Sequence, residues 1–208
     1  MNLFNPENKF WMFIAKVADV ALMSLLWFIA CLPVFTIGAA TVSFYAFTQR
    51  QVKDTEGTVF KSFFSEMKRK FLKSTAIFGV EIVTGGILAA NLWAAVHFFL
   101  FRTGGVTGVT MFAFALCGCL LFAAMAMYSF PLMARHDFGV KKTITDSFIL
   151  AMGNLPATVT LLVLAAALLA GLYFLPVFSF ILFGLYFFVS SYIFDAVFRK
   201  YEESKAAS

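Results

Sequence analysis

The chain has 208 residues, of which 62% are hydrophobic and 13% are charged, and its formal net charge is +5 at pH 7. Soluble domains are nearer half apolar and a quarter charged, so the composition excludes an ordinary soluble protein and indicates an integral membrane protein. At about 20 residues for each spanning helix, the length predicts an all-α fold. We expect a polytopic helical membrane protein with about six transmembrane helices and two cytoplasmic amphipathic helices.

The predicted elements form a single transmembrane domain over residues 1–208. Apolar runs define six spans, at about 10–32, 38–52, 74–101, 106–130, 157–175 and 177–198. Basic stretches with apolar residues at helical spacing predict interfacial helices at about 58–72 and 140–153. The uncharged part of the second span is short, so this helix is either a thin spanning helix or a partly re-entrant one.

An uncharged stretch, Leu32–Thr41, separates the first two spans. Pro33 cannot donate a backbone hydrogen bond and biases the preceding residue away from helical geometry, so one helix should end here and another begin. Thr36 is a suitable N-cap for the second helix, and Gly38 permits close helix packing. The same four letters, Leu-Pro-Val-Phe, return around Pro176 and break a later apolar run. We interpret both copies as the outer tips of membrane hairpins.

The positions of the basic residues predict the topology. With six spans and a cytoplasmic N-terminus, every Lys and Arg except Arg102 lies on the cytoplasmic side. This asymmetry follows the positive-inside rule. We therefore expect a multi-pass protein of the bacterial plasma membrane with both termini in the cytoplasm, and the lipid bilayer as its first partner.

Glu81 is the ionisable residue expected deepest in the membrane. It lies eight residues past Lys73, which is about 12 Å of helix rise. One interpretation is a proton or cation site that Asn91 extends along the same helix, because intramembrane acids are costly and default to a functional role. The other is a carboxyl group bonded to Thr84, Asn91 or a neighbouring helix. We favour the second, because no further acid or relay accompanies Glu81.

Groups that carry chemistry are otherwise sparse. The sequence has no Ser-His-Asp set at the membrane surface, and His136 with Asp137 is a lone pair instead of a metal cluster. The turn at Gly104 and Gly105 lacks the lysine of a phosphate loop. We expect a protein that is not an enzyme, with no cofactor, no metal site and no nucleic-acid partner.

Three stretches carry a family resemblance: Cys31–Ala40, Pro131–Arg135 followed by Asp137, and Asn154-Leu155-Pro156 after a short amphipathic helix. Together they make the chain similar to the YesL family (domain of unknown function 624), small membrane proteins found mainly in Firmicutes. The resemblance covers nearly the whole chain. His136 stands where the family more usually has an aromatic residue.

The resemblance implies a role beside carbohydrate ABC importers, which members of the family typically accompany. The expected function is a non-catalytic accessory subunit that associates with the permease of an oligosaccharide importer and aids its assembly, stability or regulation. One alternative is a small secondary transporter or channel that uses Glu81, and another is a membrane sensor or assembly factor. Self-association stays open. The residues expected at the partner interface are Phe60, Phe64, Arg135, Asp137, Asp146, Phe148, Asn154 and Pro156.

Overall fold

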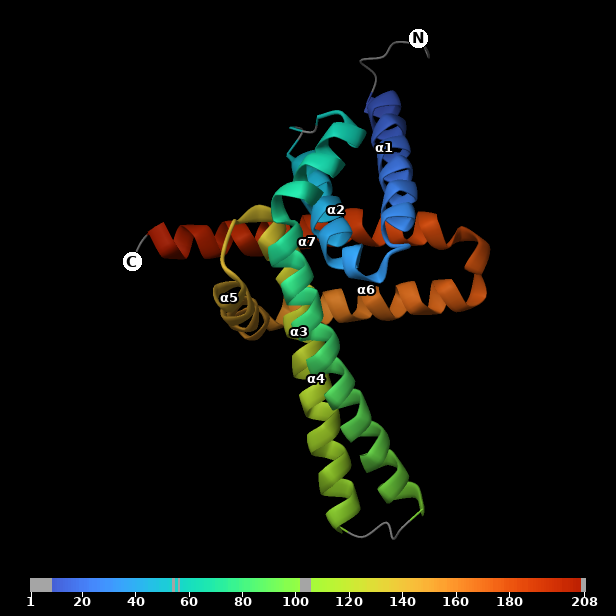
Figure 1. Cartoon of the computed structure of the whole chain (residues 1–208), viewed down its shortest axis with the longest axis vertical. Coiled ribbons are helices and arrows are strands. Elements are labelled where there is room, and N and C mark those ends of the chain that lie inside the picture. Colours follow the sequence, from blue (N-terminus) through green and yellow to red (C-terminus); the bar gives the residue numbers. More distant parts are fainter. Residues whose placement is uncertain (1–8, 54, 56, 102–105, 207–208) are drawn as a thin grey trace.

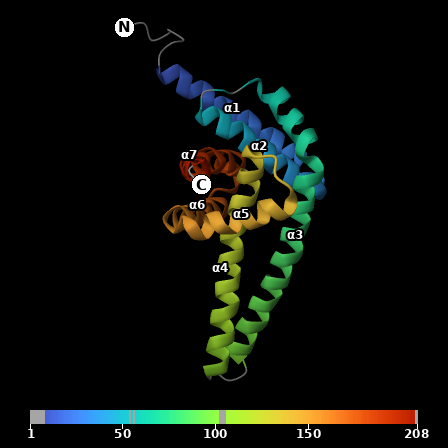
Figure 2. The same ribbon diagram turned by 90° about the vertical axis from the view of Figure 1, so that its left-hand side faces the viewer.

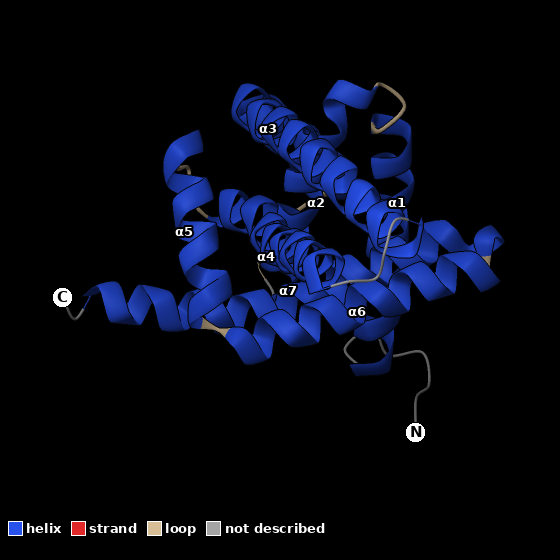
Figure 3. Ribbon diagram, turned by 90° about the horizontal axis from the view of Figure 1, so that it is seen from below, coloured by secondary structure: helices blue, strands red, loops and turns tan. Residues whose placement is uncertain are grey.

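The computed structural model describes residues 9–53, 55, 57–101 and 106–206. These residues form α-helices joined by short turns, with no strand in the described ranges (Figures 1 and 3). The helices are α1 (Lys9–Ala30), α2 (Ile37–Val52), α3 (Val59–Phe101), α4 (Val106–Arg135), α5 (Val140–Gly153), α6 (Leu155–Phe174) and α7 (Ser179–Ala206). The predicted all-helical class is confirmed.

Four of the described helices, α3, α4, α6 and α7, are long and apolar enough to cross a membrane. The structure therefore has the character of a multi-pass membrane protein. α2 has 16 residues, which rise about 24 Å, less than the ~30 Å hydrocarbon core of a bilayer. The count of six spans stays a prediction.

The helices pair into three hairpins, α1–α2, α3–α4 and α6–α7 (Figure 1). The α3–α4 hairpin extends far beyond the other helices, whereas α6 and α7 run across it (Figures 1 and 2). Short α5 lies beside the root of the long hairpin and packs against α3 and α4. The hairpins thus cross one another, in contrast to the side-by-side bundle that six upright spans would form.

The turns at the two Leu-Pro-Val-Phe copies confirm the predicted helix breaks. Each copy forms a single turn of 3-10 helix, η1 (Val34–Thr36) and η2 (Pro176–Phe178). Thr36 does hold the N-cap position of α2, but its side chain makes no cap bond. Its hydroxyl group instead donates backward to the carbonyl oxygens of Pro33, at 2.5 Å, and Ala30. It therefore closes the turn instead of capping the helix that follows.

Two predicted helix boundaries differ from the structure. The interfacial helix at 58–72 and the span at 74–101 form one continuous helix, α3, because no proline interrupts the sequence from Val59 to Phe101. The span at 106–130 does not end before Pro131, since α4 continues to Arg135. The four residues 131–134 are buried against other helices, and this packing outweighs the one hydrogen bond that proline removes.

Helix α2 is the centre of the core. Its residues from Gly38 to Gln49 are buried, and it contacts α1, α3, α4 and α7. Aromatic rings of α2 and α7 form the packing, with Phe44 and Tyr45 against Phe187 at centroid distances of 4.3 and 4.7 Å. Such pairs add stability beyond the area that they bury. The modest hydropathy of α2 follows from this position, because a helix surrounded by protein does not need lipid-soluble side chains.

The tip of the α1–α2 hairpin lies against the middle of α3. The Thr75 hydroxyl group donates to the carbonyl oxygen of Phe35 at 3.2 Å, and the rings of Phe35 and Phe71 meet edge to face. The sequence interpretation placed the tip at the outer surface and Lys73 at the cytoplasmic surface, about 30 Å apart. That pair of placements is wrong, because the two segments touch. Arg102, the one basic residue expected outside, is not among the described residues.

Candidate functional site

Charged side chains gather where four helices meet, at the end of α2, the first half of α3, the end of α4 and the second half of α7. We call this cluster the polar junction. It consists of Arg50, Lys53, Glu66, Arg69, Lys70, Arg135, Asp195 and Glu202. The junction connects helices that are distant in sequence, so it fixes how the ends of these helices are arranged.

Arg135, the last residue of α4, makes three hydrogen bonds to carboxylates in the junction. Its Nε and Nη2 atoms donate to the two carboxylate oxygens of Glu202, each at 2.8 Å, and its Nη1 donates to Asp195 at 2.6 Å. This paired geometry is the strongest that a guanidinium group forms with a carboxylate. The side chain is only 12% exposed. Arg135 was predicted to face a partner, but it is turned into the protein and holds α7 against α4.

Lys70 and Glu66 form the buried side of the junction on α3. The Lys70 ammonium group, 2% exposed, donates to the carbonyl oxygens of Met133 and Ala134 at 2.6 and 2.7 Å. These carbonyls belong to the last turn of α4, which has no helical partners for them. Lys70 therefore caps α4 with the charge that the negative end of a helix dipole favours.

Glu66 holds two arginines at the edge of the junction. Its carboxylate accepts from Arg50 on α2 and from Arg69 Nη2, the latter at 2.6 Å, and it lies 3.9 Å from the Lys70 ammonium nitrogen. One buried acid thus faces three cations. The basic residues of the predicted interfacial helix at 58–72 are therefore not all at the surface, since Lys70 is buried. The signal for burial was the helical series of positions 59, 63, 66, 70, 74 and 77, all of which the structure buries.

Uncharged polar groups of α2 complete the contacts around the junction. The side-chain amide of Gln49 donates to the carbonyl oxygen of Pro131 at 3.0 Å. The amide of Gln51 donates to the Lys16 carbonyl oxygen, and the Lys16 ammonium group donates to the Gln51 carbonyl oxygen. Deeper in the protein, the hydroxyl groups of Thr48 and Ser191 join α2 to α7 at 2.7 Å. Hydrogen bonds between helices are a common means of association in membrane proteins.

The loop after α4 carries further charged residues next to the polar junction, and one of them is exposed. Asp137 is 62% exposed and accepts from the Lys73 ammonium group at 2.6 Å, which lowers the pKa of its carboxyl group. His136 stacks on Phe138 with centroids 4.9 Å apart, and its Nε2 lies 3.2 Å from Glu202. The histidine thus stacks as an aromatic residue would at this position, and it adds a polar contact to the junction.

The remaining predicted interface residues lie on α3, α5 and the start of α6. Phe60 and Phe64 are exposed on the first turns of α3, and Phe148 is exposed on α5. Asp146 accepts from the Tyr201 hydroxyl group at 3.0 Å, which joins α5 to α7. Asn154 and Pro156 shape the turn from α5 to α6: Asn154 bonds back to the Leu150 carbonyl oxygen, and Pro156 occupies the first turn of α6. These residues do not form one continuous site.

The two predicted intramembrane polar residues are separate. Glu81 accepts from the Ser129 hydroxyl group of α4 at 2.5 Å, whereas Asn91 bonds to its own helix at the Ile87 carbonyl oxygen. Asn91 lines a cleft of about 480 Å³ near the end of the α3–α4 hairpin, and Glu81 is not among the residues of that cleft. The structure therefore brings Glu81 together with a neighbouring helix and not with Asn91.

We expect Glu81→Gln to leave the folded protein nearly unchanged, because the amide oxygen can accept the same bond from Ser129. The free energy of unfolding in detergent should change by less than about 0.6 kcal/mol, the average for a hydrogen bond between membrane helices. Ser129→Ala is the matched variant on the donor side and should cost about the same. If Glu81→Gln abolished solute flux at unchanged stability, a packing role for Glu81 would be contradicted.

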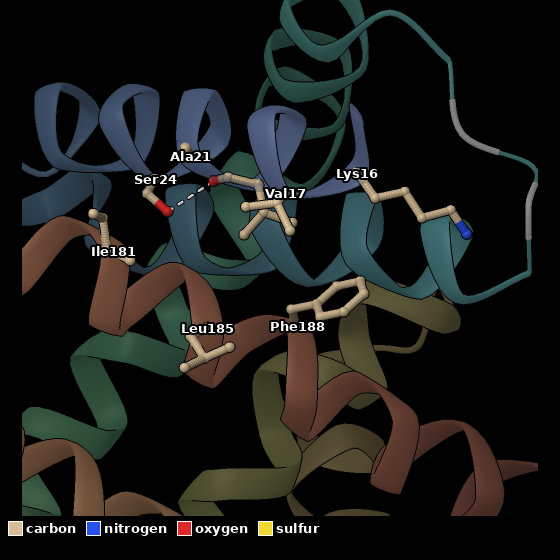
Figure 4. Close-up of a pocket in the computed structure, with 8 residues that line it drawn as sticks. Lys16, Val17, Ala21, Ser24, Ile181, Leu185 and Phe188 are labelled. Carbon is tan, nitrogen blue, oxygen red and sulfur yellow. Dashed lines mark hydrogen bonds between the residues drawn. The ribbon is translucent and has the colours of Figure 1, made fainter. Parts of the chain in front are cut away.

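A largely apolar groove lies between α1 and α7 (Figure 4). It has a volume of about 170 Å³. At its wall the two helices approach closely, because a Cβ on Gly184 would lie 2.3 Å from the Ser24 hydroxyl oxygen. Its lining residues are Lys16, Val17, Val20, Ala21 and Ser24 from α1, and Ile181, Leu185 and Phe188 from α7. Six of these eight residues are apolar, so the groove mainly offers contact to hydrocarbon.

Within the described ranges, no group of three or more His, Cys, Asp or Glu side chains could hold a metal ion. The groups of the candidate site that can interact with a partner are its charged side chains. They can hold helices together and bind charged or polar partners.

Comparison with known proteins identifies relatives of the chain. A family model described as "Protein of unknown function, DUF624" matches residues 20–92, which correspond to the second half of α1, all of α2 and most of α3. The chain is also 27% identical over 165 residues to the uncharacterized protein YesL of Bacillus subtilis (strain 168), covering 78% of this chain and 74% of that protein. No solved structure matches the chain.

Proposed function

We propose, from the premise that the chain belongs to the DUF624 family together with YesL, that it is a non-catalytic accessory subunit of a membrane complex. Its partner would be the permease of a carbohydrate ABC importer, and its role would be to aid the assembly, stability or regulation of uptake. The partner class comes from the resemblance to the YesL family described above. The architecture of α5 supports the association itself.

The observation that carries the proposal is the outward face of α5. Thr143, Ser147, Leu150 and Ala151 face inward and are buried. The large apolar residues Phe148 and Ile149 face outward and are 46% and 55% exposed. A helix that leaves two large apolar side chains uncovered offers a surface to a partner, because its own protein does not bury them.

The position of α5 adds to this argument. The helix has 14 residues, about 21 Å of rise, so it is too short to span a bilayer. It is held at one side by the bond from Tyr201 to Asp146 and carries Lys141 and Lys142 at its start. We place α5 and the polar junction on the cytoplasmic side of the plasma membrane, where basic residues accumulate. There the apolar face would meet a cytoplasmic segment of the permease.

The test is a purification of the tagged protein from native membranes in a mild detergent, followed by mass spectrometry of the proteins that accompany it. We expect permease subunits of a carbohydrate importer to be recovered with the wild type. The double variant Phe148→Ser with Ile149→Ser should reduce that recovery about tenfold or more, since two apolar anchors of an interface are lost.

The control is Val83→Ser with Ile87→Ser, which changes two exposed apolar residues of a different helix, α3. This variant should recover as much permease as the wild type. Recovery of the wild type without any permease subunit would contradict the proposed partner. Equal recovery with both double variants would contradict the role of α5.

A further inference from the structure

A basic cleft opens on the surface of the polar junction, between α2, α3 and the end of α4. Its volume is about 190 Å³. The lining residues are Ala46, Gln49, Arg50, Lys53, Arg69, Ala134 and Arg135. Four of these seven side chains are cationic and none is acidic, so the cleft has an unbalanced positive lining.

The carboxylates of the junction lie outside the cleft and form ion pairs with the cations that line it. Glu66 holds Arg50 and Arg69, and Asp195 lies 2.6 Å from Arg135 and 3.6 Å from Lys53. None of these acids lines the cleft. The arrangement orients the cations and restrains their side chains, which lowers the entropy that a ligand would have to remove.

The cations keep donors for a ligand. A guanidinium group has five N–H donors; the hydrogen bonds described use one donor of Arg69 and three of Arg135. Lys53 and Arg69 have side chains that are 48% and 57% exposed, so they stand at the mouth, whereas Arg135 lies at the base. A ligand that enters the cleft would meet guanidinium and ammonium groups on several sides.

We propose that this cleft binds a phosphate-type anion. Clustered arginines are the groups that recognise phosphate oxygens with paired hydrogen bonds, and a buried Gln49 adds an amide to the wall. The phosphate group belongs either to the headgroup of an anionic lipid or to a small phosphorylated solute. Both present the same oxygens to the same donors.

The positive and negative charges of the junction do not balance. This distinguishes an anion-binding site from a set of ion pairs that serve only the fold. The junction contains five cations but only three acids, Glu66, Asp195 and Glu202, so the positive charges outnumber the negative ones even after every ion pair is counted. A cluster of this kind repels itself unless counterions gather there. A bound anion relieves that repulsion, so binding should stabilise the fold as well as occupy the cleft.

The experiment uses the full chain in two settings. In neutral detergent, thermal unfolding is followed with sodium phosphate and with sodium chloride at matched ionic strength. In nanodiscs, lipids retained by the protein are measured by native mass spectrometry after reconstitution with phosphatidylglycerol or with phosphatidylcholine. We expect a higher melting temperature in phosphate than in chloride, or preferential retention of phosphatidylglycerol. The first result would indicate a small solute, and the second alone a lipid headgroup.

The test variant is Lys53→Gln with Arg69→Gln, which removes the two exposed cations and leaves Arg135 in place. Each charge-assisted hydrogen bond lost should weaken binding about tenfold. Lys68→Gln is the matched control, because Lys68 is an exposed cation on the same helix that does not line the cleft. The proposal is overturned if neither phosphate nor phosphatidylglycerol binds beyond its control. It is equally overturned if the double variant binds like the wild type, or if Lys68→Gln weakens binding as much.

Discussion

Arg135→Ala is expected to lower the free energy of unfolding by about 3 kcal/mol, at the lower end of the cost of breaking a buried ion pair. The substitution removes three hydrogen bonds and leaves Asp195 and Glu202 without the cation between them. Asp195 still has Lys53 at 3.6 Å, and Glu202 is 41% exposed, so water relieves part of the loss. The measurement is chemical unfolding in mixed micelles, monitored by tryptophan fluorescence.

Two further variants make this prediction specific. Arg135→Lys keeps the charge but not the planar fork that bonds both oxygens of Glu202, so it should lose a substantial part of the same stability. Lys73→Ala breaks the exposed pair with Asp137 and should cost at most about 1 kcal/mol, as surface ion pairs do. If Lys73→Ala and Arg135→Ala were equally destabilising, the junction would not be the structural centre that its burial indicates.

Besides the all-helical class, the helix breaks at the two Leu-Pro-Val-Phe copies could be predicted from the sequence. Pro33 and Pro176 both follow a leucine and precede Val-Phe, and both start the predicted interruption of a long apolar run. The reason is local: a proline changes the backbone wherever it stands. Pro131 shows the limit of the argument, because tertiary burial keeps α4 helical across it.

The interior of the candidate site could not be predicted in the same way. Lys70 and Glu66 are one helical turn apart with charges of opposite sign, a pattern that an exposed helix shows as well. Their burial depends on the ends of α2 and α4, which reach α3 only through the folded chain. The partners of Arg135 lie at least 60 residues further along the sequence. Hydropathy describes which segments enter lipid, but not which charges satisfy one another between helices.

The position of α2 illustrates the same point for packing. The short uncharged part of this segment predicted a thin or re-entrant span, and Thr41, Ser43, Thr48, Gln49 and Gln51 further reduce its apolar character. In the structure these five residues are buried among α1, α4 and α7. A helix shielded by other helices can carry polar side chains, provided that each finds a partner.

Gly38→Ala is expected to have the second large effect, because α2 and α3 touch through their backbones at this residue. A Cβ at position 38 would lie 2.6 Å from the Ser74 carbonyl oxygen and 2.9 Å from Phe78 Cβ. Neither atom is the end of a flexible side chain, so one helix must move away from the other. Overpacking of this kind costs about 2–3 kcal/mol, and the same unfolding measurement should detect it.

Gly79→Ala is the matched control, since it adds the same methyl group to α3 where no atom lies within 4 Å. Because alanine favours a helix over glycine by about 0.5–1 kcal/mol, this variant should be as stable as the wild type or slightly more so. The contrast isolates the contact between α2 and α3 from any general effect of alanine. Equal stability of the two variants would contradict the close approach, and with it the central position of α2 from which the polar junction is arranged.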